Sequence, residues 1–110
     1  MGKKVWVYFH VKVVRVIDGD TVDLDIDLGN CQHWIDRFRL LGVDTAEKAA
    51  GLVAKTFVSD WLAENGIGYV ETHGRDKYGR WLAVIVSNER SLNAELVSEG
   101  LALPYDGGRK

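Results

Sequence analysis

The residues from 22 to 28 alternate strictly between apolar side chains and carboxylates, and this pattern constrains the fold more than any other feature of the chain. The apolar positions are Val22, Leu24, Ile26 and Leu28, and the acidic positions between them are Asp23, Asp25 and Asp27. A period of two places the two sets on opposite faces of a β-strand, whereas a helix would mix them. The segment therefore predicts a strand with an apolar face toward a core and an acidic face toward solvent.

The segments on either side of this strand predict further strands. Residues 5–17 also alternate, and their apolar phase moves from odd to even positions near Val13 and Val14, as a β-bulge requires. Residues 33–41 follow a predicted turn at Gly29–Asn30. On that third strand Phe38 and Leu40 share one face, and Arg37 and Arg39 share the other. We expect the two arginines to face solvent or a cleft.

The second half of the chain predicts two helices that flank two more strands. Residues 46–65 predict the first helix, because apolar residues recur there at spacings of three and four. Those residues are Ala50, Val53, Phe57 and Trp61, with Asp44 or Thr45 as a candidate cap and Asn65–Gly66 at the end. Strands are expected at about 68–73 and 81–86, and Ser91 is expected to cap a helix that runs through Glu99.

The order of these elements, βββαββα, predicts an α+β fold built on a five-stranded Greek-key barrel of the OB-fold type. With 110 residues and no linker or internal repeat, the chain is expected to form a single domain, residues 1–110. Cys31 is the only cysteine, so no internal disulfide can form. No apolar run has the form of a signal peptide or a membrane span, so we expect an intracellular location and no membrane partner.

The charge balance limits the ways in which such a chain can bind a polyanion. Lys and Arg number 14 and Asp and Glu number 16, which gives a net charge of -2. A protein that coats nucleic acid needs many basic residues, so any grip on nucleic acid must be local. The histidines His10, His33 and His73 lack the spacing of transition-metal ligands.

A first candidate site is the segment Asp18-Gly19-Asp20-Thr21, in which two carboxylates flank a glycine between two predicted strands. Carboxylate oxygens are ligands that hard cations such as Ca²⁺ prefer. The alternative is an ordinary Asp-Gly turn that joins two strands. An EF-hand is excluded, because residue 23 is Asp where that loop needs Gly and residue 29 is Gly where it needs Glu.

Two further segments add a candidate base and fixed positive charge. Arg39 on the third strand leads into Asp44 and Glu47 at the start of the predicted helix, where capping and the helix dipole also favour acids. The loop Asp76–Arg80 ends in an arginine, although a generic turn explains it too. Phosphodiester cleavage needs a cation, a base that orients water and positive charge on the phosphoryl oxygens. The three segments together offer this set.

These motifs, in this order, resemble the staphylococcal nuclease (thermonuclease) family. The matching segments are Asp18–Thr21, Phe38–Leu41, Val43–Thr45 with Glu47, Asp76–Arg80, and Leu92–Asn93 with Leu96–Val97 and Gly100–Ala102. The resemblance extends over about residues 11–105. It implies an OB-fold barrel with packed helices, in agreement with the order of elements derived from the residues themselves.

The resemblance also implies one bound calcium ion. Asp20 and Asp44 match the carboxylates that hold the ion in this family, and Thr45 matches the residue that offers its backbone carbonyl. Asp18 matches an acid in the outer shell of the same site. The expected cofactor is therefore Ca²⁺.

The same resemblance implies an endonuclease that hydrolyses DNA or RNA and leaves 3'-phosphate ends. Glu47 matches the acid that orients or deprotonates the attacking water, and Arg39 and Arg80 match the arginines that bind the scissile phosphate. A planar, permanently charged guanidinium suits that role. The weaker matches are to residues that contact a bound nucleotide: Lys77, Tyr78 and Tyr105.

One departure from the family and one alternative function bear on this interpretation. Ala46 stands where the family usually has proline, so the backbone before Glu47 is less restricted. The expected enzyme is a monomer that acts on single-stranded or locally open nucleic acid, and Trp6 or Trp34 is available to stack on bases. The alternative is a catalytically silent module of the same fold that binds nucleic acid or protein.

Overall fold

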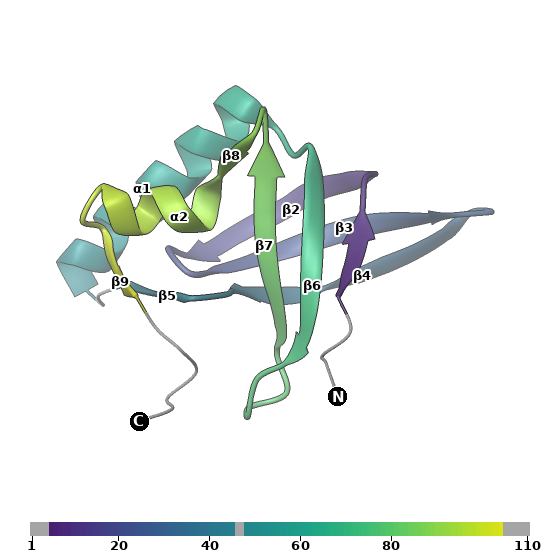
Figure 1. Ribbon diagram of the computed structural model, residues 1–110, viewed down its shortest axis with the longest axis horizontal. Helices are drawn as coiled ribbons and strands as arrows, with labels where there is room; N and C mark the ends of the chain where they lie inside the picture. The colour runs from purple at the N-terminus through teal and green to yellow at the C-terminus, as the bar shows by residue number, and fades with distance from the viewer. Residues whose placement is uncertain (1–4, 46–47, 105–110) are drawn as a thin grey trace.

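The computed structural model describes residues 5–45 and 48–104 (Figure 1). The strands are β1 (Trp6–Tyr8), β2 (Val11–Asp18), β3 (Thr21–Gly29), β4 (Gln32–Leu40), β5 (Val43–Thr45), β6 (Tyr69–Arg75), β7 (Trp81–Ser87), β8 (Arg90–Ser91) and β9 (Ala102–Pro104). The helices in these residues are α1 (Lys48–Asn65) and α2 (Leu92–Ser98). The predicted α+β order is confirmed, with the short strands β5, β8 and β9 added to it.

The main sheet runs in the order β1-β6-β7-β4-β3-β2, with β4 and β7 parallel. The first predicted strand is divided near residues 9–10, so that β1 pairs with β6 and β2 pairs with β3. Consecutive pieces of chain thus lie at the two edges of the sheet, as the predicted OB-fold barrel requires. The expected bulge is present, because the register of β2 on β3 shifts between Val13 and Arg15.

The apolar faces of the strands fill the barrel. The fully buried residues of β3 and β4 are Val22, Leu24, Ile26, Phe38 and Leu40. Leu28 continues the same alternation but is 49% exposed, because the β3–β4 hairpin extends beyond the other strands in Figure 1. On the opposite face Asp23 accepts a 2.8 Å hydrogen bond from Nε of Arg37. The alternation therefore predicts which face is buried but not where the core ends.

Helix α1 packs one side against the barrel. Within residues 51–65 its buried residues are Ala54, Val58, Trp61 and Leu62. Of the residues whose spacing predicted the helix, Trp61 is buried and Phe57 packs against the core, whereas Val53 is 57% exposed. Apolar residues stand on several sides of this helix, and local spacing alone cannot choose among them. Contacts with β2, β5 and α2 select the buried side.

Helix α2 begins as the sequence predicts and is tied to the sheet by a buried amide. Ser91 is the N-cap, and its hydroxyl accepts a 3.1 Å hydrogen bond from the Ala94 amide. The Asn93 side chain donates to the carbonyls of Leu41 and Ala83 at 2.8 and 2.9 Å and accepts from the Ile85 amide at 3.1 Å. It thereby joins α2 to β7 and to the turn that leads out of β4.

Strand β5 pairs with β9 in a small second sheet below the helices (Figure 1). Asp44 and Thr45 are therefore strand residues, and not the helix cap that the sequence left open. Neither α1 nor α2, the helices of the described residues, has the length and apolar content that a membrane crossing needs.

Candidate active site

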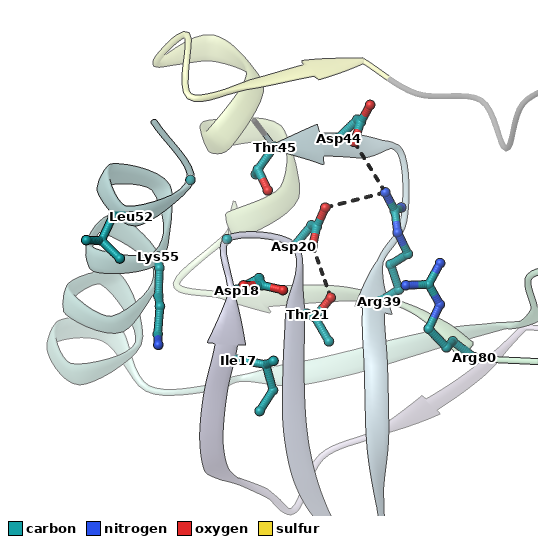
Figure 2. A pocket seen from close by; sticks show the side chains of 12 residues that line it. Ile17, Asp18, Asp20, Thr21, Arg39, Asp44, Thr45, Leu52, Lys55 and Arg80 are labelled. Atoms are coloured by element: carbon teal, nitrogen blue, oxygen red, sulfur yellow. Dashed lines mark hydrogen bonds and ion pairs between the residues drawn. The ribbon is translucent and has the colours of Figure 1, made fainter. Parts of the chain in front are cut away.

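A pocket of about 500 Å³ opens where the β2–β3 turn, the end of β4, strand β5 and helix α1 meet (Figure 2). The residues predicted from the sequence that line it are Asp18, Asp20, Arg39, Asp44, Thr45 and Arg80. They come from segments as far apart in the chain as Asp18 and Arg80, and the barrel brings them to one place. Figure 2 shows Arg39 and Arg80 on one side of the pocket and α1 on the other.

The β2–β3 turn is held in position by a close approach of backbone to helix. Gly19 is buried, and a Cβ atom built on it would lie 2.6 Å from Cβ of Ala54 and 3.0 Å from Cγ2 of Thr45. The Asp20 carbonyl accepts a 2.8 Å hydrogen bond from the Leu40 amide. Glycine is thus needed for space, and this explains the Asp-Gly-Asp sequence beyond a simple turn preference.

The carboxylates of Asp20 and Asp44 both lie close to the guanidinium of Arg39. Its Nη2 lies 3.4 Å from Oδ2 of Asp20 and 3.7 Å from Oδ1 of Asp44, and the residue is only 8% exposed. Thr21 donates a 3.0 Å hydrogen bond from its hydroxyl to the other oxygen of Asp20. A buried guanidinium needs such partners, because an unpaired buried charge is very unfavourable. The carboxylates of Asp20 and Asp44 therefore converge on the same part of the pocket.

The donor atoms of this corner fit a hard cation. They are the carboxylate oxygens of Asp20 and Asp44, the hydroxyl of Thr45, and the exposed carboxylate of Asp18. All are oxygens, which suits Ca²⁺ and not a thiophilic metal. Within residues 5–45 and 48–104 no three His, Cys, Asp or Glu side chains gather closely enough to hold a metal alone. A cation here would need backbone carbonyls and water to complete its shell.

The β6–β7 loop is organised by Asp76. Its Oδ1 accepts hydrogen bonds of 2.9 Å from the amides of both Tyr78 and Arg80, and its Oδ2 accepts 2.9 Å from Nε of Arg80. Burial by itself raises the pKa of Asp76, but the hydrogen bonds from Arg80 and Tyr78 and the charge of Arg80 outweigh it, so the pKa lies below 3.8. The hydrogen bonds to Asp76 thus hold Arg80 in a position from which it lines the pocket.

The loop residues Lys77 and Tyr78 lie outside the pocket lining. Tyr78 is 71% exposed, and its ring centroid is 5.4 Å from the guanidinium of Arg80 and 5.6 Å from the ammonium of Lys77. The Tyr78 ring therefore contacts the side chains of Arg80 and Lys77, and neither Lys77 nor Tyr78 reaches the carboxylates that line the pocket. Glu47 and Tyr105, the other predicted site residues, fall outside the described residues, as does Ala46.

Helix α1 contributes pocket residues that sequence reasoning missed. Leu52 and Lys55 line the side of the pocket opposite Arg39 (Figure 2). They lie three residues apart, so they share a helix face, and that face is the one beside the buried stripe at Ala54 and Val58. No local pattern singled out Leu52 or Lys55, because their place in the pocket depends on which side of α1 is buried.

Residues 37–109 match the protein family described as staphylococcal nuclease homologue. The chain is 35% identical over 99 residues to a thermonuclease of Staphylococcus intermedius, covering 82% of this chain and 56% of that protein. It is 32% identical over 96 residues to an uncharacterized endonuclease of Haemophilus influenzae, covering 86% and 51%. It is 30% identical over 111 residues to a micrococcal nuclease of Shigella flexneri, covering 91% and 60%. The chain thus spans little more than half the length of these relatives.

Proposed function

Because the chain belongs to the staphylococcal nuclease family, we propose that it is a nuclease that hydrolyses phosphodiester bonds in DNA, RNA or both. The observation that carries this proposal is the convergence of Arg39 and Arg80 with Asp20 and Asp44 in one pocket. The relatives named as thermonuclease and micrococcal nuclease support the same reaction class.

The charges of the pocket suit an anionic substrate only when a cation is bound. Among its described lining residues, the carboxylates Asp18, Asp20 and Asp44 balance the cations Arg39, Lys55 and Arg80. A bound divalent ion would leave a net positive charge in the pocket, which favours a phosphodiester. This balance explains how a chain with a net charge of -2 can bind nucleic acid locally.

Calcium is the proposed ion, held by Asp20, Asp44 and the backbone carbonyl of Thr45, with Asp18 in the outer shell. When bound, it would neutralise negative charge on the phosphoryl oxygens. The arginines act on the same oxygens: Arg80 reaches in from the β6–β7 loop and Arg39 from β4. Each donor placed where charge develops contributes on the order of 3 kcal/mol to transition-state stabilisation.

Glu47 is the proposed base, on the match of its position to the family acid. It takes a proton from water as the water oxygen bonds to phosphorus, and the bond from phosphorus to the 5'-oxygen breaks. The 5'-oxygen leaves as a hydroxyl after it gains a proton, and the other fragment ends in a 3'-phosphate. We propose an unpaired or locally open strand as substrate and a monomer as the active form.

The test is digestion of labelled single-stranded DNA and RNA in calcium, in magnesium and in chelator. We expect cleavage with calcium, none with chelator, and 3'-phosphate ends on the products. Arg80→Lys should lower kcat/KM by about a hundredfold or more, because a lysine cannot bind a phosphate in bidentate fashion. Arg37→Lys is the matched control, because Arg37 lies on the same strand as Arg39 but does not line the pocket and pairs with Asp23.

Equal cutting in all three solutions would exclude the metal role. A protein that binds single strands tightly but leaves them intact in every solution would instead favour the catalytically silent module. Glu47→Gln at parental activity would remove Glu47 as the base while leaving the arginines in place.

A further inference from the structure

A second pocket, of about 480 Å³, opens between β1, β4, β6 and β7. Its lining includes Trp6, Tyr8, Trp34, Arg75 and Trp81, and we call it the aromatic pocket. Trp6 is 58% exposed, and Trp34 and Trp81 are half-buried. The proposed catalytic reaction uses none of these residues.

The rings of the aromatic pocket are held in place from the core side. Trp34 is the central ring, and its centroid lies 5.1 Å from Phe38, 5.2 Å from Trp81 and 5.8 Å from Tyr8. All three contacts are edge to face, and Phe38 is fully buried. Rings that meet at their edges do not stack on one another, so they form walls of a hollow that a flat ligand can enter.

A β-bulge places a positive charge at the rim of the aromatic pocket. The register of β6 on β7 shifts between Thr72 and Arg75, and Gly74 adopts a φ of 91° within the bulge. The shift pairs Arg75 with Trp81, and the guanidinium carbon lies 4.8 Å from the Trp81 ring centroid. Arg75 is exposed, so it can contact a phosphate while it packs on the ring.

The β6–β7 hairpin joins the aromatic pocket to the catalytic one. Arg75 and Trp81 line the aromatic pocket, whereas Arg80 lines the catalytic pocket. Strand β4 also borders both pockets, but Trp34 and Arg39 are five residues apart, so their side chains lie on opposite faces of the strand. A nucleic-acid strand whose phosphate lies at Arg39 and Arg80 therefore reaches the aromatic pocket by passing around the β6–β7 hairpin, which borders both pockets.

We infer that the aromatic pocket binds an unpaired base of the nucleic-acid strand, a few nucleotides from the scissile phosphate. The inference rests on the proposed nuclease function for the position of that phosphate. Planar walls next to basic side chains are the two features that single-strand binding sites combine, and a base within a duplex cannot enter because both its faces are already stacked. A methylated lysine is a poorer occupant, because Arg75 already holds the cation position over Trp81.

The test measures binding separately from cleavage. A Glu47→Gln protein, which lacks the proposed base, is titrated in calcium with a fluorescent single strand of twelve thymidines and with a blunt duplex of the same length. Trp6→Ala in this background should weaken binding of the single strand about tenfold and leave the duplex unchanged, and Trp6→Phe should restore most of the loss. Arg75→Gln should also weaken binding and reduce the salt dependence by about one phosphate contact.

The matched control is Ile35→Ala, because Ile35 is 62% exposed on β4 but lies on the face opposite Trp34. Equal thermal midpoints of the four variants show that the fold is intact. The inference is overturned if Trp6→Ala binds the single strand as tightly as its parent, or if Ile35→Ala loses as much. It is also overturned if a trimethyl-lysine peptide binds in a Trp6-dependent way and the single strand does not.

Cleavage separates this inference from the proposed function. In the wild-type background Trp6→Ala should raise KM for the twelve-nucleotide strand and leave cleavage of a dinucleotide unchanged, since a dinucleotide is too short to reach the aromatic pocket. If the wild-type protein cleaves the strand and Trp6→Ala leaves KM unchanged, the proposed role of the aromatic pocket is refuted and the nuclease function is not. A parent that never cleaves but needs Trp6 to bind single strands refutes the nuclease function and retains the pocket as a binding site.

Discussion

Gly19 and Ala54 are in contact so close that neither position has room for a larger side chain. A Cβ on Gly19 would come within 2.6 Å of the Cβ of Ala54, and Ala54 itself is fully buried. This contact fixes the β2–β3 turn, and with it Asp18 and Asp20, against helix α1. The position of the candidate metal ligands thus depends on a packing contact made thirty-five residues away along the chain.

Gly19→Ala should disturb the site as well as the fold. We expect a loss of about 1–3 kcal/mol in the free energy of unfolding, as for other overpacked positions. The turn must move to relieve the contact, so calcium affinity and activity should fall more than stability does. Denaturant titration measures the stability, and calcium titration measures the calcium affinity.

Ala54→Gly offers a compensating change for Gly19→Ala. Alone it should cost about 1 kcal/mol, because glycine disfavours a helix interior. The double variant should lose less stability than the sum of the losses of the two single variants, and its calcium affinity should recover. Simple additivity of the two changes would show that the contact does not position the turn.

Asp76→Asn should make the stability of the protein less dependent on pH. The pKa of Asp76 in the folded state lies below its ordinary value of 3.8, so its stabilising contribution is present above pH 3.8 and is lost as pH falls through the folded pKa. At neutral pH the variant should be less stable by roughly 2 kcal/mol, since charge-assisted hydrogen bonds are lost. The difference from wild type should shrink as the pH falls below 3.8.

Unfolding free energies of the two proteins across this pH range provide the measurement. Asp60→Asn is a suitable control, because Asp60 is exposed on α1. A pH-independent gap between wild type and Asp76→Asn would contradict the role of the ionised carboxylate in ordering the Arg80 loop.

Asn93→Ala should destabilise the protein by about 2–4 kcal/mol, because it leaves the carbonyls of Leu41 and Ala83 and the amide of Ile85 without their side-chain partner. Asn93→Asp keeps the acceptor for Ile85 but removes both donors, so it should also be destabilising. Thermal unfolding distinguishes these variants from wild type. Stability of Asn93→Asp equal to wild type would show that the two donated bonds contribute little.

Lys55→Gln tests the pocket residue that the sequence did not identify. We expect KM for nucleic acid to rise and the salt dependence of binding to weaken by about one phosphate contact, with stability nearly unchanged. Lys55→Arg should retain most of the binding. Lys12→Gln is the matched control, because Lys12 is exposed on β2 and lines a different pocket, near His33. Equal effects of the two glutamine variants would indicate a general charge effect and not a contact in the site.

Local periodicity determined much of this protein from its sequence. The alternation of residues 22–28 predicted the buried face of β3, and the same rule placed Phe38 and Leu40 inside and Arg37 outside. Ser91 as a helix cap and the bulge beside Val13 also followed from residue type and spacing. These features depend on interactions between residues close in the chain, and the local sequence is sufficient to predict such interactions.

Only the tertiary structure decided which residues meet. Val53 and Leu28 fit the local patterns but are exposed, because the core ends where neighbouring elements end and not where a pattern does. Lys55 enters the pocket and Trp34 joins Trp81 only because β4 pairs with β7 and α1 packs beside the β2–β3 turn. Closure of the barrel sets these distances, since it brings together segments whose separation along the chain carries no record of their contact.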